Sequence, residues 1–150
     1  MNYKRAQKEI LNALLSADPV TETVVPGGSV MLTIGGVMGY VFPADVNRID
    51  LEKIEAHLSW TALRLDQIVQ VRANRVEITD DLLDKRGTIL RKLRHIVDDE
   101  LVYIPEAMLK NFDNPTAYQG QKLGPVVLTE DDDLEGEHIV GFIMPYKVNE

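Results

Sequence analysis

Cysteine is absent from this 150-residue chain, which excludes disulfides, thiolate metal sites and cysteine nucleophiles. A chain without cysteine fits a reducing compartment, so we expect a cytoplasmic protein. Long apolar runs are absent as well, since no stretch approaches the roughly 18 residues of a membrane span. The N-terminal segment has periodic apolar positions interrupted by polar residues, unlike the continuous apolar core of a signal peptide. We therefore expect no contact with membranes.

Positive charge is in short supply, because 16 lysine and arginine residues face 24 aspartate and glutamate residues, for a net charge of −8. Such a charge disfavours nonspecific attraction to nucleic acid or to anionic lipid. The imbalance is concentrated in one part of the chain. Residues 1–95 contain 13 cationic and 12 acidic residues, whereas residues 96–150 contain 3 and 12. Two surfaces of different charge are therefore expected.

What is present is the composition of a globular protein. Hydrophobic residues make up 45% of the chain and charged residues 27%, which is far from the composition of a disordered segment. The length is that of one ordinary domain with a sizeable core. No internal repeat and no long linker interrupts the chain, so we predict a single domain over residues 1–150.

The most informative stretch is Ser29–Phe42, which reads SVMLTIGGVMGYVF and lies between two proline-containing turn signals. Gly35-Gly36 at its centre can take the positive φ angles that tight hairpin turns require. The stretch therefore predicts a hairpin of two antiparallel strands, Val30–Ile34 and Val37–Phe42. Both alternating sets of side chains are mostly apolar, so we expect the hairpin to be covered on both sides, by helices, another sheet or a second subunit.

A second hairpin is predicted at about residues 125–146, where two β-type runs flank an acidic turn. Apolar residues at helical spacing predict helices over Tyr3–Ala17, from Asp50 to either Leu58 or about Val69, and from Thr79 to about Val97. Gly87 is the one weak position of this last helix. We thus predict an α+β fold in which hairpins at about 30–42 and 125–146 pack with about three helices.

Between these elements the pattern favours shorter pieces. Leu101–Ile104 is strand-like, and Pro105–Phe112 is typical of a short helix with proline in its first turn. Asp113–Gly124 is rich in turn residues and predicts a mobile loop. Tyr118 in this loop is expected to be exposed and is a candidate contact for a partner protein, although such a tyrosine more often lies against the surface.

The acidic turn at residues 130–137 is the most chemical-looking segment. Asp131, Asp133 and Glu135 alternate as oxygen ligands for a divalent cation would, and Gly136 follows them. The calcium-loop pattern then fails, because Phe142 occupies the twelfth position, where a bidentate glutamate belongs. The segment therefore indicates either a solvated hairpin tip or a weak divalent-metal site.

Cations gather within residues 85–95, which are predicted to be helical: Lys85, Arg86, Arg91, Lys92 and Arg94. Such a basic helix could bind nucleic-acid phosphates or an acidic partner. It could equally be a solvated helix face, or pair with the acidic final third of the chain. The overall charge and the lack of a recognised DNA-binding pattern weigh against nucleic acid.

No motif for catalysis or cofactor binding is present in the sequence, so we expect neither a cofactor nor, on balance, an enzyme. A catalytic site assembled from distant residues stays open, since spacing does not report proximity. The leading hypothesis is a non-enzymatic cytoplasmic binding or assembly protein that associates with itself or with another protein, because apolar hairpins and sheet edges favour pairing. The alternatives are a nucleic-acid-associated protein using the basic helix 85–95 and a divalent-metal-dependent protein using the acidic turn 130–137.

Overall fold

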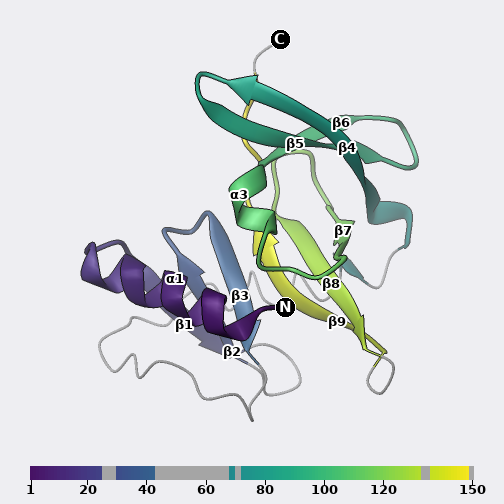
Figure 1. Ribbon diagram of the computed structural model, residues 1–150. Coiled ribbons are helices and arrows are strands. Elements are labelled where there is room, and N and C mark those ends of the chain that lie inside the picture. Colours follow the sequence, from purple (N-terminus) through teal and green to yellow (C-terminus); the bar gives the residue numbers. More distant parts are fainter. Residues whose placement is uncertain (25–29, 43–67, 70–71, 133–135, 149–150) are drawn as a thin grey trace.

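The computed structural model describes residues 1–24, 30–42, 68–69, 72–132 and 136–148 (Figure 1). In this part of the chain nine strands form one sheet, in the order β1-β2-β3-β9-β8-β7-β4-β5-β6, and each pairing is antiparallel. The strands are β1 (Val20–Val24), β2 (Val30–Ile34), β3 (Met38–Phe42), β4 (Arg75–Lys85), β5 (Thr88–His95), β6 (Leu101–Pro105), β7 (Thr116–Tyr118), β8 (Val126–Asp132) and β9 (Gly136–Ile143). The helices are α1 (Tyr3–Leu15) and α3 (Glu106–Leu109), and a 3-10 turn spans Arg72–Asn74.

The predicted fold of hairpins packed with about three helices is wrong, because one continuous sheet dominates the structure. Within the described residues there are two α-helices, and only α1 is longer than a single turn. The hairpins predicted at 30–42 and 125–146 are present as β2–β3 and β8–β9, but both are parts of the same sheet. The helix predicted from Asp50 falls outside the described residues except for its last positions, Ile68 and Val69.

Helix α1 forms where the apolar periodicity predicted it. Asn2 caps its start, since the Asn2 side chain accepts a hydrogen bond from the Arg5 amide at 3.1 Å. Ala6, Ile10 and Ala13 are the buried residues of its inner face. The helix ends where Ala17 takes a positive φ of 61°, because the next amide, that of Asp18, then returns to the Ala13 carbonyl at 2.9 Å.

The β2–β3 hairpin turns at Gly35 and Gly36, whose φ angles of 59° and 70° are the positive values expected for a primed turn. All five residues of β3 are buried, as predicted for a strand covered on both sides. Tyr40 and Phe42 join a cluster that includes α1 on one face. Met31 and Val41 join a second cluster on the other face, against which Ile68 and Val69 pack. The covering groups thus come from this chain itself.

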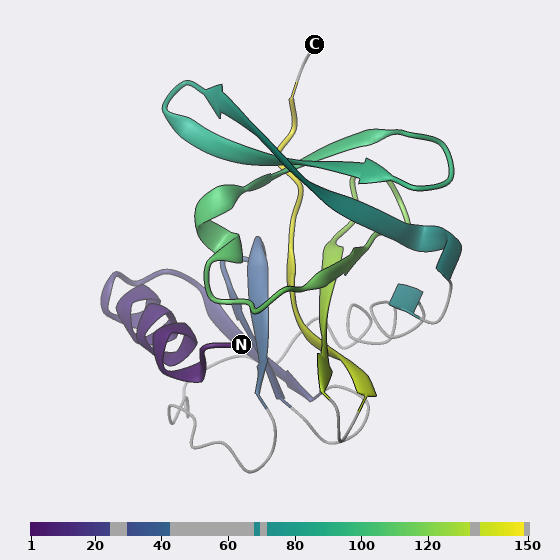
Figure 2. The same ribbon diagram turned by 45° about the vertical axis from the view of Figure 1, so that its right-hand side comes forward.

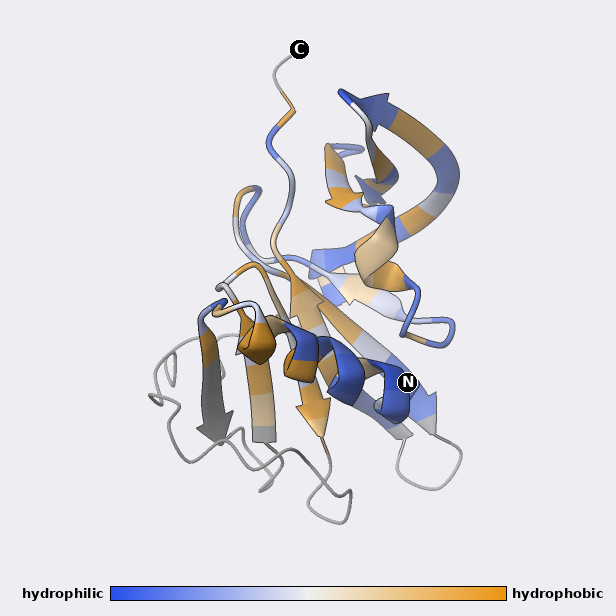
Figure 3. Ribbon diagram, turned by 60° about the vertical axis from the view of Figure 1, so that its left-hand side comes forward, coloured by the Kyte–Doolittle hydropathy of each residue, from blue (hydrophilic) through white to orange (hydrophobic). Residues whose placement is uncertain are grey.

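The helix predicted from Thr79 to Val97 is wrong, because these residues form the β4–β5 hairpin. Leu83 pairs with Leu90, and Lys85 pairs with Thr88 across a two-residue turn. Arg86 and Gly87 have φ angles of 53° and 89°, and the Gly87 amide donates to Asp84 Oδ1 at 2.9 Å. Gly87 is therefore the turn itself and no defect in a helix. Figure 3 shows the resulting alternation of hydrophobic and hydrophilic residues along these strands.

Of the shorter predicted elements, the strand and the short helix are confirmed, whereas the predicted loop contains a strand. Strand β6 covers the strand-like run at Leu101, and α3 forms inside the predicted short helix. The predicted loop Asp113–Gly124 contains strand β7, which bridges β4 and β8. β7 pairs with β4 at only two positions, ending at Ala117, and Pro115 has no amide to continue the ladder.

The sheet bends so that its two ends form different layers. Strands β1, β2 and β3 lie beside α1, whereas β4, β5 and β6 form a layer across the opposite end of the molecule (Figures 1 and 2). One buried cluster joins the layers, with contributions from Ile10, Tyr40, Leu93, Ile104 and Phe112. Beyond β9 the chain passes back to β6, where the Tyr146 amide donates to the Tyr103 carbonyl at 2.7 Å.

Replacing Gly87 by alanine should lower the free energy of unfolding by about 1 kcal/mol, since an alanine resists positive φ. No atom lies within 4 Å of the position that the new Cβ would take, so the cost is purely conformational. In a helix the same change would raise stability by about 1 kcal/mol. Urea unfolding followed by circular dichroism measures the sign, and Gly87→Asn is the control, because asparagine tolerates positive φ better. A more stable alanine variant would contradict the hairpin.

Candidate functional site

The predicted basic helix 85–95 does not exist, and its cations are distributed over a hairpin. Lys85 ends β4, Arg86 lies in the turn, and Arg91, Lys92 and Arg94 belong to β5. Neighbouring residues on a strand point to opposite faces, so Arg91 and Lys92 cannot form one patch. The structure therefore divides the predicted basic surface.

The cations of β5 are paired with acidic residues of this chain. Arg91 donates through Nε and Nη2 to the two carboxylate oxygens of Glu106, and its Nη1 donates to the Thr79 carbonyl at 3.1 Å. The Glu106 hydrogen bonds raise the pKa of the Arg91 guanidinium. Arg94 Nη2 donates to Glu77 Oε2 at 2.6 Å, and Lys92 Nζ lies 4.0 Å from Asp81. These pairs would compete with phosphate at Arg91, Lys92 and Arg94, and the nucleic-acid alternative stays a prediction.

The acidic turn is only partly described. Asp131 lies on β8 and is exposed, whereas Asp133 and Glu135 fall outside the described residues. Among the residues that the structure describes, no three carboxylates or histidines come together as a metal site. A metal bound by Asp131, Asp133 and Glu135 stays a prediction.

The expectation of an exposed Tyr118 is wrong. Its side chain belongs to β7 and is only 5% exposed, packed with Val127 and Phe142. The Tyr118 hydroxyl donates to Glu137 Oε1 at 2.7 Å. Burial and this hydrogen bond raise the pKa of Tyr118. Tyr118 thus joins β7 to β9 inside one chain, and a partner could not reach its ring without rearrangement.

A buried polar cluster joins α1, β3 and the segment after α3. The Tyr40 hydroxyl donates to Glu9 Oε2 and accepts a hydrogen bond of 2.9 Å from Asn111 Nδ2. Lys110 Nζ lies 3.8 Å from the other oxygen of Glu9. Burial, followed by the bond to Glu9, raises the pKa of Tyr40. These bonds tie Glu9 of α1 to Tyr40 of β3 and so help to hold α1 on the sheet.

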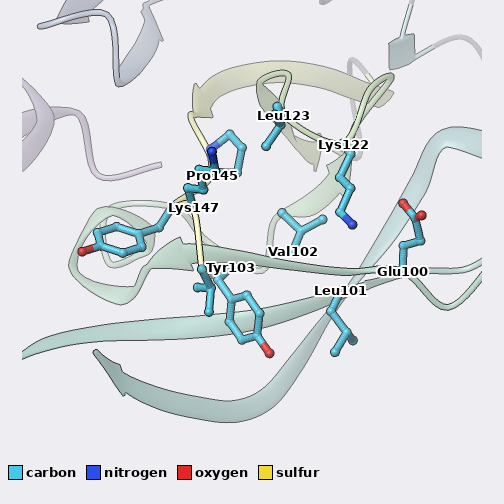
Figure 4. A pocket seen from close by; sticks show the side chains of 10 residues that line it. Glu100, Leu101, Val102, Tyr103, Lys122, Leu123, Pro145 and Lys147 are labelled. Carbon is cyan, nitrogen blue, oxygen red and sulfur yellow. The ribbon is translucent and has the colours of Figure 1, made fainter. Parts of the chain in front are cut away.

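A groove of about 540 Å³ opens beside the outer edge of β6 (Figure 4). Three separate segments form its walls: Glu100 with the first residues of β6, the connection after β7, and the chain that follows β9. The groove is lined by Glu100, Leu101, Val102, Tyr103, Lys122, Leu123, Pro145, Tyr146, Lys147 and Val148. Leu123 is 66% exposed and Tyr146 is 38% exposed, so apolar surface faces solvent here.

The wall that carries Lys122 and Leu123 is held in place by one buried side chain. Gln119 is only 1% exposed, and its Nε2 donates to the carbonyls of Lys122 and Gly124 at 2.9 and 3.0 Å. Its Oε1 must then accept, and it lies 2.7 Å from His95 Nε2. The groove wall is therefore anchored to the end of β5.

The β4–β5 hairpin carries a second apolar surface. Strand β6 ends at Pro105, opposite Leu90, so the hairpin continues beyond it as a two-stranded ribbon. Leu82 pairs with Arg91 while Asp84 pairs with Ile89, which places Leu82 and Ile89 diagonally on one face. Leu82 is 56% exposed and Ile89 is 42% exposed. We call this pair the hairpin patch.

Sequence reasoning found neither surface. The groove combines residues that are separated by about 20 positions at each step, and no spacing rule connects them. The apolar spacing places Leu82 and Ile89 in a predicted helix, although the pair Arg86-Gly87 between apolar residues is a signal for a hairpin turn.

None of the helices in the described part of the chain is long and apolar enough to cross a bilayer. Comparison of the chain with protein-family models, with curated proteins and with solved structures finds no match.

Proposed function

We propose that this protein is a non-enzymatic binding and assembly protein that associates with a second copy of itself. The observation that carries the proposal is the hairpin patch, where two large aliphatic side chains lie together in solvent on a ribbon that has lost its neighbouring strand. A cytoplasmic setting, as expected from the cysteine-free sequence, belongs to the same proposal.

The hairpin patch suits contact with an identical patch. In a twofold dimer the same residues face each other, so the surface has to be self-complementary. Leu82 and Ile89 are bordered on their own face by Arg91, which is cationic, and by Asp84, which is acidic. A rotated copy can bury the aliphatic side chains against each other while Arg91 keeps its partner Glu106 within the chain.

The proposal is tested by light scattering on a sizing column at low and high salt. We expect a mass of about twice the 16.9 kDa of one chain. This mass should change little with salt, because burial of aliphatic surface is screened far less than charge pairing. Leu82→Asp should weaken association at least about tenfold, since burial of one leucine contributes about 1.5–3 kcal/mol.

Leu15→Asp is the matched control, because Leu15 at the end of α1 is 77% exposed and lies away from the hairpin. It should leave the mass unchanged. A wild-type protein that stays at the mass of one chain at every concentration would overturn self-association. A dimer that Leu82→Asp leaves intact would overturn the hairpin patch as its interface.

A further inference from the structure

We propose that the groove beside β6 binds an extended, acidic segment of another protein, which adds to the sheet as a further strand along β6. This inference rests on the proposed function, because both assume that the protein functions by binding other protein chains. It concerns a different surface and a different partner from the hairpin patch.

The first argument is the backbone of β6. The Glu100 carbonyl accepts from the His95 amide, so the backbone groups of Val102 and Ile104 also point toward β5. Those of Leu101 and Tyr103 therefore point outward. The Tyr103 carbonyl accepts from Tyr146. In the described structure the Tyr103 amide and both backbone groups of Leu101 have no hydrogen-bond partner. An edge of this kind is a template for one more strand.

The second argument is the position of the chain that follows β9. Met144 is hydrogen-bonded to the Val37 carbonyl at 2.7 Å, and two residues later Tyr146 reaches β6. A single bond, from Tyr146 to Tyr103, thus begins a strand pairing that this chain does not continue toward Leu101. The free part of the edge begins beyond this bond, at Leu101, and the groove beside it is lined also by Lys147 and Val148 (Figure 4).

The third argument is charge. Residues 96–150 contain only 3 cationic residues against 12 acidic ones, and two of the three, Lys122 and Lys147, line the groove. Both are exposed, and neither forms an ion pair within the described part of the chain. The cations of β5 are paired instead. The lining holds one acidic residue, Glu100, against these two unpaired lysines, and this excess of positive charge favours an acidic ligand.

The fourth argument is the apolar lining. Leu123, Pro145 and Val102 come from three different segments and supply apolar lining to the groove (Figure 4). Alternate side chains of an added strand point to one face, so every second residue of the ligand would enter this lining. The ligand should therefore alternate aliphatic with acidic residues and lack proline where it pairs.

The experiment uses a phage library of random dodecapeptides, selected on the 150-residue protein. We expect enriched peptides to alternate aliphatic and acidic residues. Binding of one such synthetic peptide should slow hydrogen exchange of the Leu101 and Tyr103 amides at least about tenfold, because strand pairing buries them. Lys122→Glu combined with Lys147→Glu should weaken binding about tenfold or more.

Lys4→Glu combined with Arg5→Glu is the control, since it changes the net charge equally on the exposed side of α1. This variant should bind the peptide nearly as well as the wild type. The proposal is overturned if no peptide is enriched, if the groove variant and the control bind equally, or if protection appears elsewhere than at Leu101 and Tyr103. Peptide binding by a protein that stays a monomer would refute self-association and leave the groove standing. A dimer that selects no peptide would refute the groove proposal and leave self-association standing.

Discussion

Replacing Gly141 by alanine should lower the free energy of unfolding by about 3 kcal/mol or more, the largest effect that we expect from a single methyl group here. Gly141 lies on β9 where that strand meets β3, and it pairs with Tyr40. An added Cβ would lie 2.2 Å from the Gly39 carbonyl oxygen and 2.9 Å from the Phe112 ring. The first contact is with backbone, so no rotation of a side chain can relieve it.

The close approach has a local cause in the sheet. The β8–β9 register shifts between Leu128, which pairs with Gly141, and Thr129, which pairs with Ile139. Val140 is the extra residue of this bulge, and a bulge sharpens the local twist of a strand. β9 is thereby brought against β3 at Gly141, in the interior of the nine-stranded sheet of the described residues.

Urea unfolding followed by circular dichroism tests the expectation, with Gly87→Ala as the reference because its cost is conformational only. Combining Gly141→Ala with Phe112→Leu should give no recovery, since the backbone contact persists. If the double variant regained stability, the ring of Phe112 would be the obstacle and the strand spacing would be adjustable. An alanine variant as stable as wild type would mean that β3 and β9 do not approach as described.

Replacing Tyr40 by phenylalanine should cost about 2–3 kcal/mol of unfolding free energy, although it removes one oxygen atom only. The Tyr40 side chain is fully buried, and its hydroxyl bonds both Glu9 and Asn111. Without the hydroxyl, the partly exposed Glu9 carboxylate loses a donor, and the Asn111 amide loses its acceptor in a site that is only 1% exposed. Among the described residues Asn111 Oδ1 is already without a hydrogen-bond partner, so Tyr40→Phe would leave the Asn111 side chain with no hydrogen bond.

The matched control is Tyr118→Phe, which removes one hydrogen bond to the more exposed Glu137 and should cost about 1 kcal/mol. Replacing Glu9 by alanine together with Tyr40→Phe should cost less than the sum of the two single changes, because each already breaks the same bond. Additive effects in this double-mutant cycle would contradict the coupling between the helix and the strand.

The same cluster predicts how stability depends on pH. Burial and Glu9 raise the pKa of Tyr40 above its ordinary value of about 10. The unfolded chain therefore loses its Tyr40 proton first, and the stabilisation is complete below pH 10 and is lost as the pH rises above it. Tyr40→Phe should flatten the alkaline decline measured by urea unfolding between about pH 9 and pH 11. Part of the decline should remain, since the pKa of Tyr118 is raised too.

Predictions from the sequence are confirmed where interactions between residues close in the chain determine the structure. The apolar period of α1, its Asn2 cap and the Gly35-Gly36 turn all act within a few residues. They failed over Thr79–Val97, where leucines at Leu82, Leu83, Leu90 and Leu93 fit the period of a helix as well as mirror positions in a hairpin. The turn at Gly87 decides between the two, and its positive φ is compatible only with the hairpin.

The sequence by itself determined that this is a cysteine-free, acidic globular chain with an amphipathic first helix and two apolar hairpins, because these properties depend on composition and near neighbours. Only the tertiary structure decided which strands share a sheet, which cations find acidic partners, and which edge stays open. Lys122 and Lys147 illustrate the difference. In the sequence they are isolated lysines, and in the fold they face one groove, because strand pairing over long separations brings β6, the segment after β7 and the segment after β9 together.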